Sequence, residues 1–105
     1  MRVPTGRFEQ RIAKTESVEL LHLDESPIAK VEAFTENVSP RGARVITDSI
    51  WAPGKLVRLD APKEQVNLPG RVVYCQPLGG GKFAVGLQLG ARVEKWQKPH
   101  QLWRC

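Results

Sequence analysis

The segment GGGKFAVGLQL, residues 79–89, carries the strongest secondary-structure signal in the chain. From Lys82 to Leu89, large apolar side chains alternate with small or polar ones, and this period of two is typical of a strand with one buried face. The three glycines at 79–81 supply the free φ angles that a hairpin connection needs. The segment therefore predicts a β-hairpin whose second strand packs one face against a core.

Shorter runs of the same kind recur toward the N-terminus. Extended structure is predicted for Val18–Leu23, Ile28–Phe34, Ala43–Thr47, Lys55–Leu59 and Arg71–Cys75. Turn signals stand between them, notably Ala52-Pro53-Gly54 and Asn67-Leu68-Pro69-Gly70. Short strands with regularly spaced turns predict an all-β antiparallel sandwich or small barrel. With about six strands, closure into a barrel would also remove exposed strand edges.

The length of 105 residues predicts one domain with differing ends. Residues 1–14 lack alternation and are expected to form a flexible N-terminal arm. Residues 17–90 would form the barrel. Residues 91–105 would be a short helix or tail, because Arg92–Gln97 can form one or two helical turns before Pro99 stops them.

Composition restricts the functional classes. Hydrophobic residues make up 41% of the chain, which suits a folded domain, and no apolar run approaches the roughly 20 residues of a membrane span. The N-terminus lacks a secretory signal, so a cytoplasmic location is expected. Two cysteines and two histidines, Cys75, Cys105, His22 and His100, lack zinc-site spacing, so neither metal nor cofactor is predicted. Catalytic signatures are absent, and the sequence does not indicate an enzyme.

The charge is unevenly distributed. The net charge is +5, and residues 71–105 hold six Lys or Arg residues against one acid, Glu94. A basic region can contact nucleic acid, an anionic membrane surface or an acidic partner, or can simply be solvated. The basic residues are scattered without the interleaved aromatics that stack single-stranded bases, so nucleic acid is not the favoured partner.

Two stretches carry binding chemistry. In Arg7-Phe8-Glu9-Gln10-Arg11, two arginines stand four positions apart. Each planar guanidinium can donate paired hydrogen bonds to phosphate oxygens or to the O6/N7 edge of guanine. The alternative is two solvated arginines on one face, paired with Glu9 or Glu16.

The second stretch is Asn37-Val38-Ser39-Pro40-Arg41-Gly42. Asn37 and Ser39 can both donate and accept hydrogen bonds, and at i and i+2 they can project to the same face. Gly42 would permit a positive φ and a close approach of a ligand to the backbone. The alternative is a plain turn, in which Asn37 and Ser39 bond to their own backbone.

In combination, an Arg-x-x-x-Arg stretch before the first strand and Asn-x-Ser-x-x-Gly at a later turn resemble the PilZ domain family. The segments ARVIT and FAVGLQL are similar to the third and last barrel strands of that family. The resemblance runs from about Arg7 to Leu89. The family often has another arginine just before the first motif, where this chain has Gly6.

The resemblance implies a small antiparallel six-stranded β-barrel that serves as a bacterial receptor for the second messenger cyclic di-GMP. Arg7 and Arg11 would grip the phosphates and guanine edges from the arm, while Asn37 and Ser39 contact a guanine and Gly42 leaves room beside it. Arg41 and Arg44 would add charge or stack on a base. Ordering of the arm would then signal to a protein partner. The alternatives are a nucleic-acid-binding small β-barrel and a PilZ-like protein-interaction module that binds no nucleotide.

Overall fold

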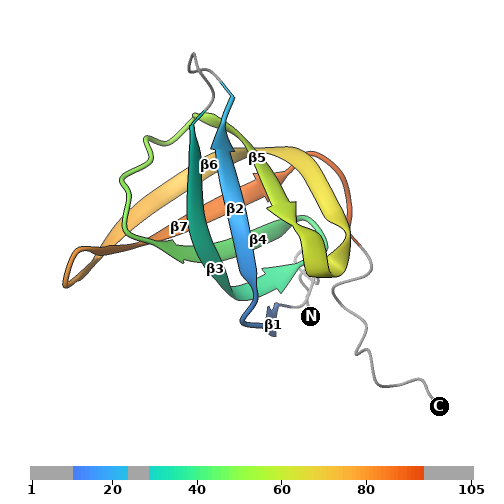
Figure 1. Cartoon of the computed structure of the whole chain (residues 1–105), viewed down its shortest axis with the longest axis horizontal. Coiled ribbons are helices and arrows are strands. Elements are labelled where there is room, and N and C mark those ends of the chain that lie inside the picture. Colours follow the sequence, from blue (N-terminus) through green and yellow to red (C-terminus); the bar gives the residue numbers. More distant parts are fainter. Residues whose placement is uncertain (1–10, 24–28, 94–105) are drawn as a thin grey trace, which may run out of the picture.

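Six antiparallel strands close into a barrel in the computed structural model, which describes residues 11–23 and 29–93 (Figure 1). The barrel strands are β2 (Ser17–His22), β3 (Lys30–Ser39), β4 (Gly42–Thr47), β5 (Leu56–Ala61), β6 (Val66–Gly79) and β7 (Lys82–Leu89). Their order around the barrel is β3-β2-β5-β6-β7-β4, and pairing of β3 with β4 closes the ring. A two-residue strand, β1 (Ile12–Ala13), and a 3₁₀ turn, η2 (Pro62–Glu64), complete the described elements. The predicted all-β barrel is confirmed.

The core forms because each strand turns its alternate apolar side chains inward. Leu20 on β2, Val45 on β4, Leu59 on β5 and Val85 on β7 are all fully buried. Burying one such side chain contributes about 1.5–3 kcal/mol. The predicted strand over residues 82–89 is confirmed, although Ala84 and Gly86 on its other face are buried as well as Val85 and Leu87. The three glycines before β7 all have positive φ angles, as the predicted hairpin requires.

The loop between β4 and β5 closes one end of the barrel. Its Trp51 is 1% exposed and stacks on His22 at the end of β2, with ring centroids 3.8 Å apart. The predicted turn at Ala52-Pro53-Gly54 is confirmed, since the Lys55 N–H donates to the Ala52 carbonyl and Gly54 has a φ of 91°.

One predicted turn, over residues 67–70, is wrong. β6 begins at Val66, and Leu68 pairs with Leu59 while Pro69 pairs with Arg58. Pro69 precedes the first pair between β6 and β7, which joins Gly70 to Leu89. Proline is tolerated where a strand lacks one neighbour, so strand pairing overrides the local turn chemistry here.

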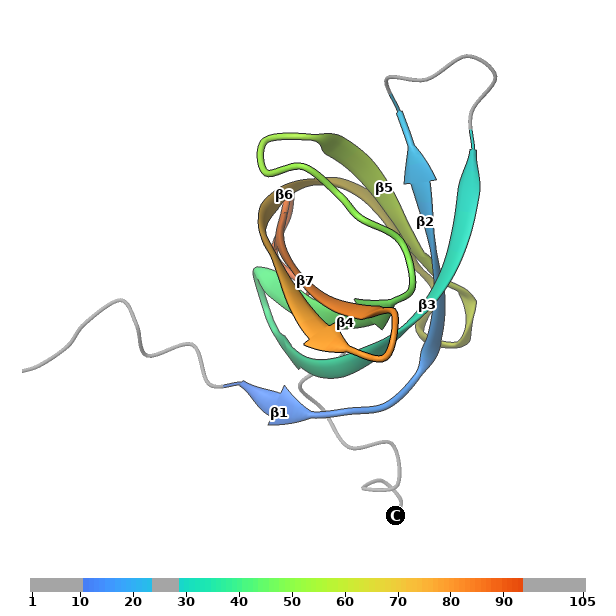
Figure 2. The same ribbon diagram turned by 90° about the vertical axis from the view of Figure 1, so that its left-hand side faces the viewer.

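The segment before β2 is part of the sheet although it lies at the end of the predicted arm. β1 pairs with β3 through Ile12–Val38 and Ala13–Asn37, and β2 pairs with the earlier half of β3. Together β1 and β2 form one interrupted strand along β3, and Figure 2 shows β1 leading into it. The rest of the predicted arm, residues 1–10, lies outside the described residues, as does most of the predicted C-terminal helix or tail.

An ion pair fixes the link between β1 and β2. Lys14 Nζ lies 2.8 Å from Glu64 Oε2 on η2 and 3.7 Å from Glu16 Oε1. The Thr35 hydroxyl donates to the Lys14 carbonyl, and the Lys14 N–H donates to the Glu36 carbonyl. These bonds tie the chain that follows Arg11 to β3 and to η2. In the described part of the chain, no helix is long and apolar enough to span a membrane.

Candidate functional site

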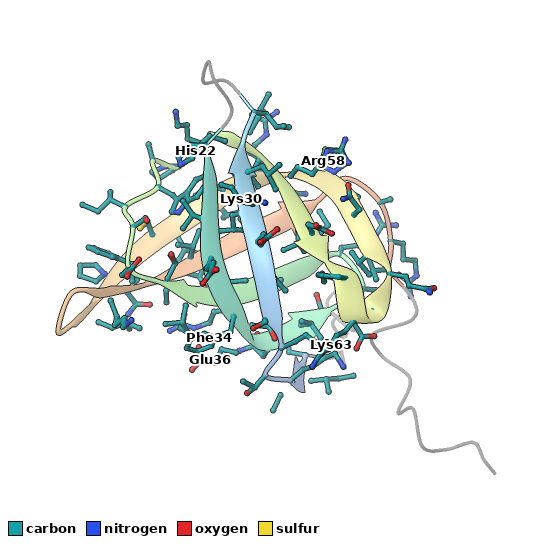
Figure 3. All side chains as sticks on the ribbon, in the orientation of Figure 1. His22, Lys30, Phe34, Glu36, Arg58 and Lys63 are labelled. Carbon is teal, nitrogen blue, oxygen red and sulfur yellow. The ribbon has the colours of Figure 1, made fainter. Side chains whose placement is uncertain are left out.

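A β-bulge in β3 brings two consecutive polar side chains to the outer surface. Thr35 pairs with Val45 on β4, whereas the next pair joins Asn37 to Arg44. Glu36 is therefore the extra residue. Thr35 is fully buried, while Glu36 is exposed and Asn37 is half-buried, and Figure 3 shows Glu36 pointing away from the barrel. Because a bulge re-aims side chains in this way, Glu36 and Asn37 share the outer face with Arg44.

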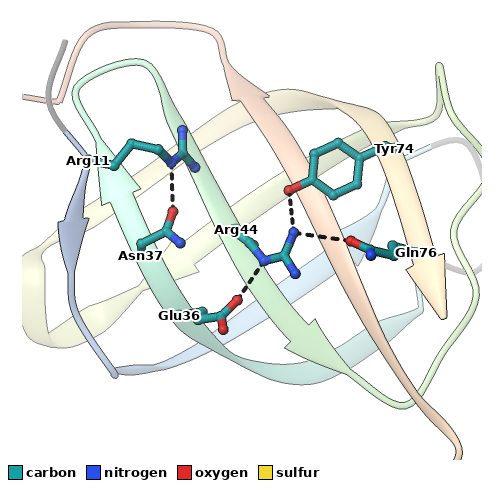
Figure 4. A network of polar contacts seen from close by, with 6 residues as sticks. All are labelled: Arg11, Glu36, Asn37, Arg44, Tyr74 and Gln76. Atoms are coloured by element: carbon teal, nitrogen blue, oxygen red, sulfur yellow. Dashed lines mark hydrogen bonds and ion pairs between the residues drawn. The ribbon is translucent and has the colours of Figure 1, made fainter. Parts of the chain in front are cut away.

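Arg11 reaches the same face from the N-terminal side. It stands directly before β1, and the register of β1 with β3 places it near Ser39. Its Nε donates a 2.7 Å hydrogen bond to Asn37 Oδ1 (Figure 4). Arg11 of the Arg-x-x-x-Arg motif and Asn37 of the Asn-x-Ser-x-x-Gly motif are 26 residues apart in sequence and are in direct contact.

Position 42 leaves little room for a side chain. Gly42 pairs with Ser39 across the β3–β4 turn, and a Cβ on it would lie 3.0 Å from the Leu87 carbonyl oxygen, 3.5 Å from Ser39 Oγ and 3.8 Å from Arg11 Nη1. The expected positive φ is wrong, since Gly42 lies in β4 with φ outside the left-handed region. Arg11, Asn37, Ser39 and Gly42 thus form one contiguous cluster, the motif patch, in which Arg11 and Asn37 are accessible and Ser39 and Gly42 lie beneath them.

The turn around the motif is shorter than predicted. β3 continues to Ser39, so Asn37 and Ser39 are strand residues and the turn is formed by Pro40 and Arg41. Ser39 is 5% exposed, so its hydroxyl lies beneath the patch surface. Arg41 is exposed, and its carbonyl accepts a 2.9 Å hydrogen bond from the Leu89 N–H.

Arg44 lies beside the motif patch in a network of its own (Figure 4). Its Nε donates to Glu36 Oε1 at 2.5 Å, and its Nη1 donates to Tyr74 Oη at 3.0 Å and to Gln76 Oε1 at 3.3 Å. The guanidinium carbon lies 5.8 Å from the centre of the Tyr74 ring. The hydrogen bond to Glu36, and then the one to Tyr74, raises the pKa of Arg44 above its ordinary value. Three side chains, one from β3 and two from β6, thus hold the cation.

Tyr74 can reach Arg44 because Gly86 separates them. Arg44 on β4 pairs with Gly86 on β7, and Gly86 pairs with Tyr74 on β6. A Cβ at Gly86 would lie only 2.2 Å from the Tyr74 ring. The ring therefore lies flat across β7 over the glycine.

A groove of about 690 Å³ lies next to the motif patch on the outer faces of β2 and β3. Its lining includes the carboxylates Glu19, Glu32 and Asp48 and the apolar side chains Phe34 and Ile46. None of the four motif-patch residues lines it. These three carboxylates outnumber the two lysines of the lining, Lys30 and Lys82. The groove therefore has no net positive charge to attract an anionic ligand, and the motif patch is the better candidate for one.

The comparison with known families tests the resemblance noted in the sequence. The family model for the PilZ domain matches residues 6–101. The chain belongs to the PilZ domain family. The PilZ family is a family of ligand-binding receptor domains associated with cyclic di-GMP, and it is not a catalytic family. No curated protein matches this PilZ domain.

Of the site residues predicted from the sequence of this PilZ domain, the structure brings Arg11, Asn37, Ser39 and Gly42 together. Arg44 is their neighbour on β4, whereas Arg7 lies outside the described residues. Sequence reasoning missed the partners of Arg44, which are Glu36, Tyr74 and Gln76. The sequence shows that Tyr74 and Gln76 stand two positions apart in an extended segment. It does not show that they face Arg44, because that depends on the registers of β6 and β4 with β7.

Proposed function

We propose that this PilZ domain is a bacterial receptor for cyclic di-GMP and binds the nucleotide on the motif patch. The observation that carries the proposal is the 2.7 Å hydrogen bond between Arg11 and Asn37, which joins the two motifs at one place. Family membership supports the nature of the ligand. No cofactor other than the nucleotide is proposed.

The chemistry of the patch complements the ligand. Cyclic di-GMP carries two phosphates and two guanines, and an arginine fork recognises both phosphate oxygens and the guanine O6/N7 edge. Only the Nε of Arg11 is engaged by Asn37, and Arg11 is exposed. The asparagine amide adds donor and acceptor groups at the same place. The missing Cβ of Gly42 keeps the surface between Ser39 and Arg11 low.

The arginine motif extends the proposal to Arg7. We propose that Arg7 contributes a second guanidinium from residues 1–10 and that this arm becomes ordered over the bound nucleotide. Ordering a segment costs conformational entropy, which charge-assisted contacts must offset. The changed surface would then be recognised by a protein partner in the cytoplasm.

The test is calorimetric titration of cyclic di-GMP into the whole chain at two temperatures. Arg11→Ala should weaken binding about 10- to 100-fold, since a hydrogen bond to a charged group contributes about 1.5–3 kcal/mol. The matched control is Arg58→Ala. Arg58 Nη1 also donates a 2.7 Å hydrogen bond to an asparagine, Asn67, but on β5 and β6, away from the motif patch. Its loss should change the affinity less than twofold.

Other outcomes would favour the alternatives. Absence of binding heat at both temperatures, with a folded domain, would contradict the receptor proposal and favour a protein-interaction module. Binding of RNA or DNA that survives Arg11→Ala but is lost when Lys95 and Lys98 are neutralised would favour a nucleic-acid-binding barrel. Equal losses from Arg11→Ala and Arg58→Ala would place the ligand elsewhere.

A further inference from the structure

We propose that Glu36 is an internal counter-ion of the site and sets its affinity for an anionic ligand by neutralising Arg44. This inference rests on the proposed function. Glu36 is the extra residue of the bulge in β3, next to Asn37, and Arg44 is the cross-strand partner of Asn37. A cation that could bind a ligand phosphate at the edge of the motif patch is therefore already paired with a carboxylate of the protein.

The geometry shows how complete this pairing is. Glu36 Oε1 accepts from Arg44 Nε at 2.5 Å, and Tyr74 and Gln76 accept from Arg44 Nη1. The Glu36 side chain is half exposed and that of Arg44 one-quarter exposed, at 50% and 25%. Water and a ligand can therefore reach the pair. An incoming phosphate would meet the carboxylate of Glu36 as well as the guanidinium of Arg44.

The network also predicts that Arg44 keeps its place when Glu36 loses its charge. Tyr74 and Gln76 belong to β6, on the far side of β7, and they hold Nη1 independently of β3. In Glu36→Gln the amide oxygen can still accept from Nε, so the side-chain position is preserved while one negative charge is removed. This variant isolates the electrostatic effect of Glu36.

The size of the effect follows from Coulomb's law. Asn37 and Arg44 are directly opposite each other, so a ligand on the motif patch would lie within about 6–8 Å of the Glu36 carboxylate. At an effective dielectric constant between about 40 and 80, removing one charge at that distance should tighten binding of an anion about three- to tenfold. The gain should shrink as salt screens the interaction.

The experiment compares the cyclic di-GMP affinity of the wild type with that of four variants by calorimetry. Glu36→Gln should bind about three- to tenfold more tightly than the wild type. Arg44→Met, which leaves the carboxylate uncompensated, should bind more weakly, and Glu36→Gln/Arg44→Met should return close to the wild-type affinity. The control is Glu32→Gln, an exposed carboxylate on the same face of β3. It lies four residues earlier, at least a Debye length of about 8–10 Å away, and should have a smaller effect.

Each result has one reading. An unchanged or weaker affinity of Glu36→Gln would overturn the inference, and a loss would mean that the carboxylate contacts the ligand, for example a guanine edge. A double variant as weak as Arg44→Met would also overturn it, because Arg44 would then bind the ligand directly. If the wild type does not bind cyclic di-GMP, the proposed function fails. Inorganic pyrophosphate then replaces the nucleotide as the probe, and Glu36→Gln must still bind it more tightly.

Discussion

Removing one partner of the ion pair between Lys14 and Glu64 should destabilise the domain far more than removing one partner of a surface pair. The two side chains are 19% and 4% exposed, and their charged atoms are 2.8 Å apart. Removing one partner of a fully buried pair costs about 3–5 kcal/mol, because the remaining charge is stranded. Since Lys14 is partly accessible to water, we expect Lys14→Met to lower the free energy of unfolding by about 2–3 kcal/mol.

The assay is urea unfolding followed by circular dichroism, with thermal unfolding as a second measure. A loss of about 2–3 kcal/mol should lower the midpoint temperature by about 10–20 °C in a domain of this size. Lys30→Met is the matched control. Lys30 also pairs with a glutamate, Glu19, but at 3.7 Å and with side chains 59% and 34% exposed. Its loss should cost less than about 0.5 kcal/mol.

A double variant separates the cost of an unpaired buried charge from the net contribution of the ion pair to stability. In Lys14→Met/Glu64→Met the Glu64 carboxylate is removed together with its partner, and Glu16, 3.7 Å from Lys14 Nζ, loses a nearby cation. Most of the stability lost in Lys14→Met should therefore be recovered. The reasoning is refuted if Lys14→Met is as stable as Lys30→Met. It is also refuted if the losses from Lys14→Met and from Glu64→Met, each measured alone, simply add in the double variant, since that would mean the charges do not interact.

The remaining predictions concern packing and screening. Gly86→Ala should cost about 1–3 kcal/mol in urea unfolding, because its Cβ would overlap the Tyr74 ring; wild-type stability would show that the ring moves freely. Trp51→Ala should cost about 3–5 kcal/mol by the same measurement, since it empties the end of the barrel under His22, and a cost below about 1 kcal/mol would contradict the role of Trp51 in closing it. The affinity for cyclic di-GMP should fall steadily between about 50 and 500 mM salt, as expected for a charged site, and a salt-independent affinity in calorimetry would argue against phosphate contacts.

The hydrophobic periodicity predicted the strands correctly where large apolar side chains recur at every second position. In residues 82–89 the large apolar side chains stand at every second position, and β7 has the predicted bounds. Over residues 67–70 the same reasoning failed, because asparagine, proline and glycine favour turns in isolation. In the fold these residues pair with β5. Local composition does not record the long-range hydrogen bonds that a neighbouring strand offers.

The candidate site was predictable only in part for a related reason. The placement of Asn37 and Ser39 on one face follows from their spacing of two. The bulge does not follow from any such rule, and without it Glu36 would point to the opposite face from Asn37. The approach of Tyr74 to Arg44 depends on the registers of two strand pairs, one with its own bulge between Val72 and Tyr74. Such registers are set by the whole barrel.

The hairpin between β6 and β7 offers a practical use of the fold. Its glycines, 79–81, all have positive φ, and a Cβ added to any of them would meet no described atom within 4 Å. The tip projects beyond the barrel (Figure 1), and its last glycine, Gly81, lies five residues along the chain from Gly86, about 17 Å away. Exposed loop tips tolerate insertions best. A fluorescent protein or a pair of new chain termini could therefore be placed there while leaving the motif patch intact.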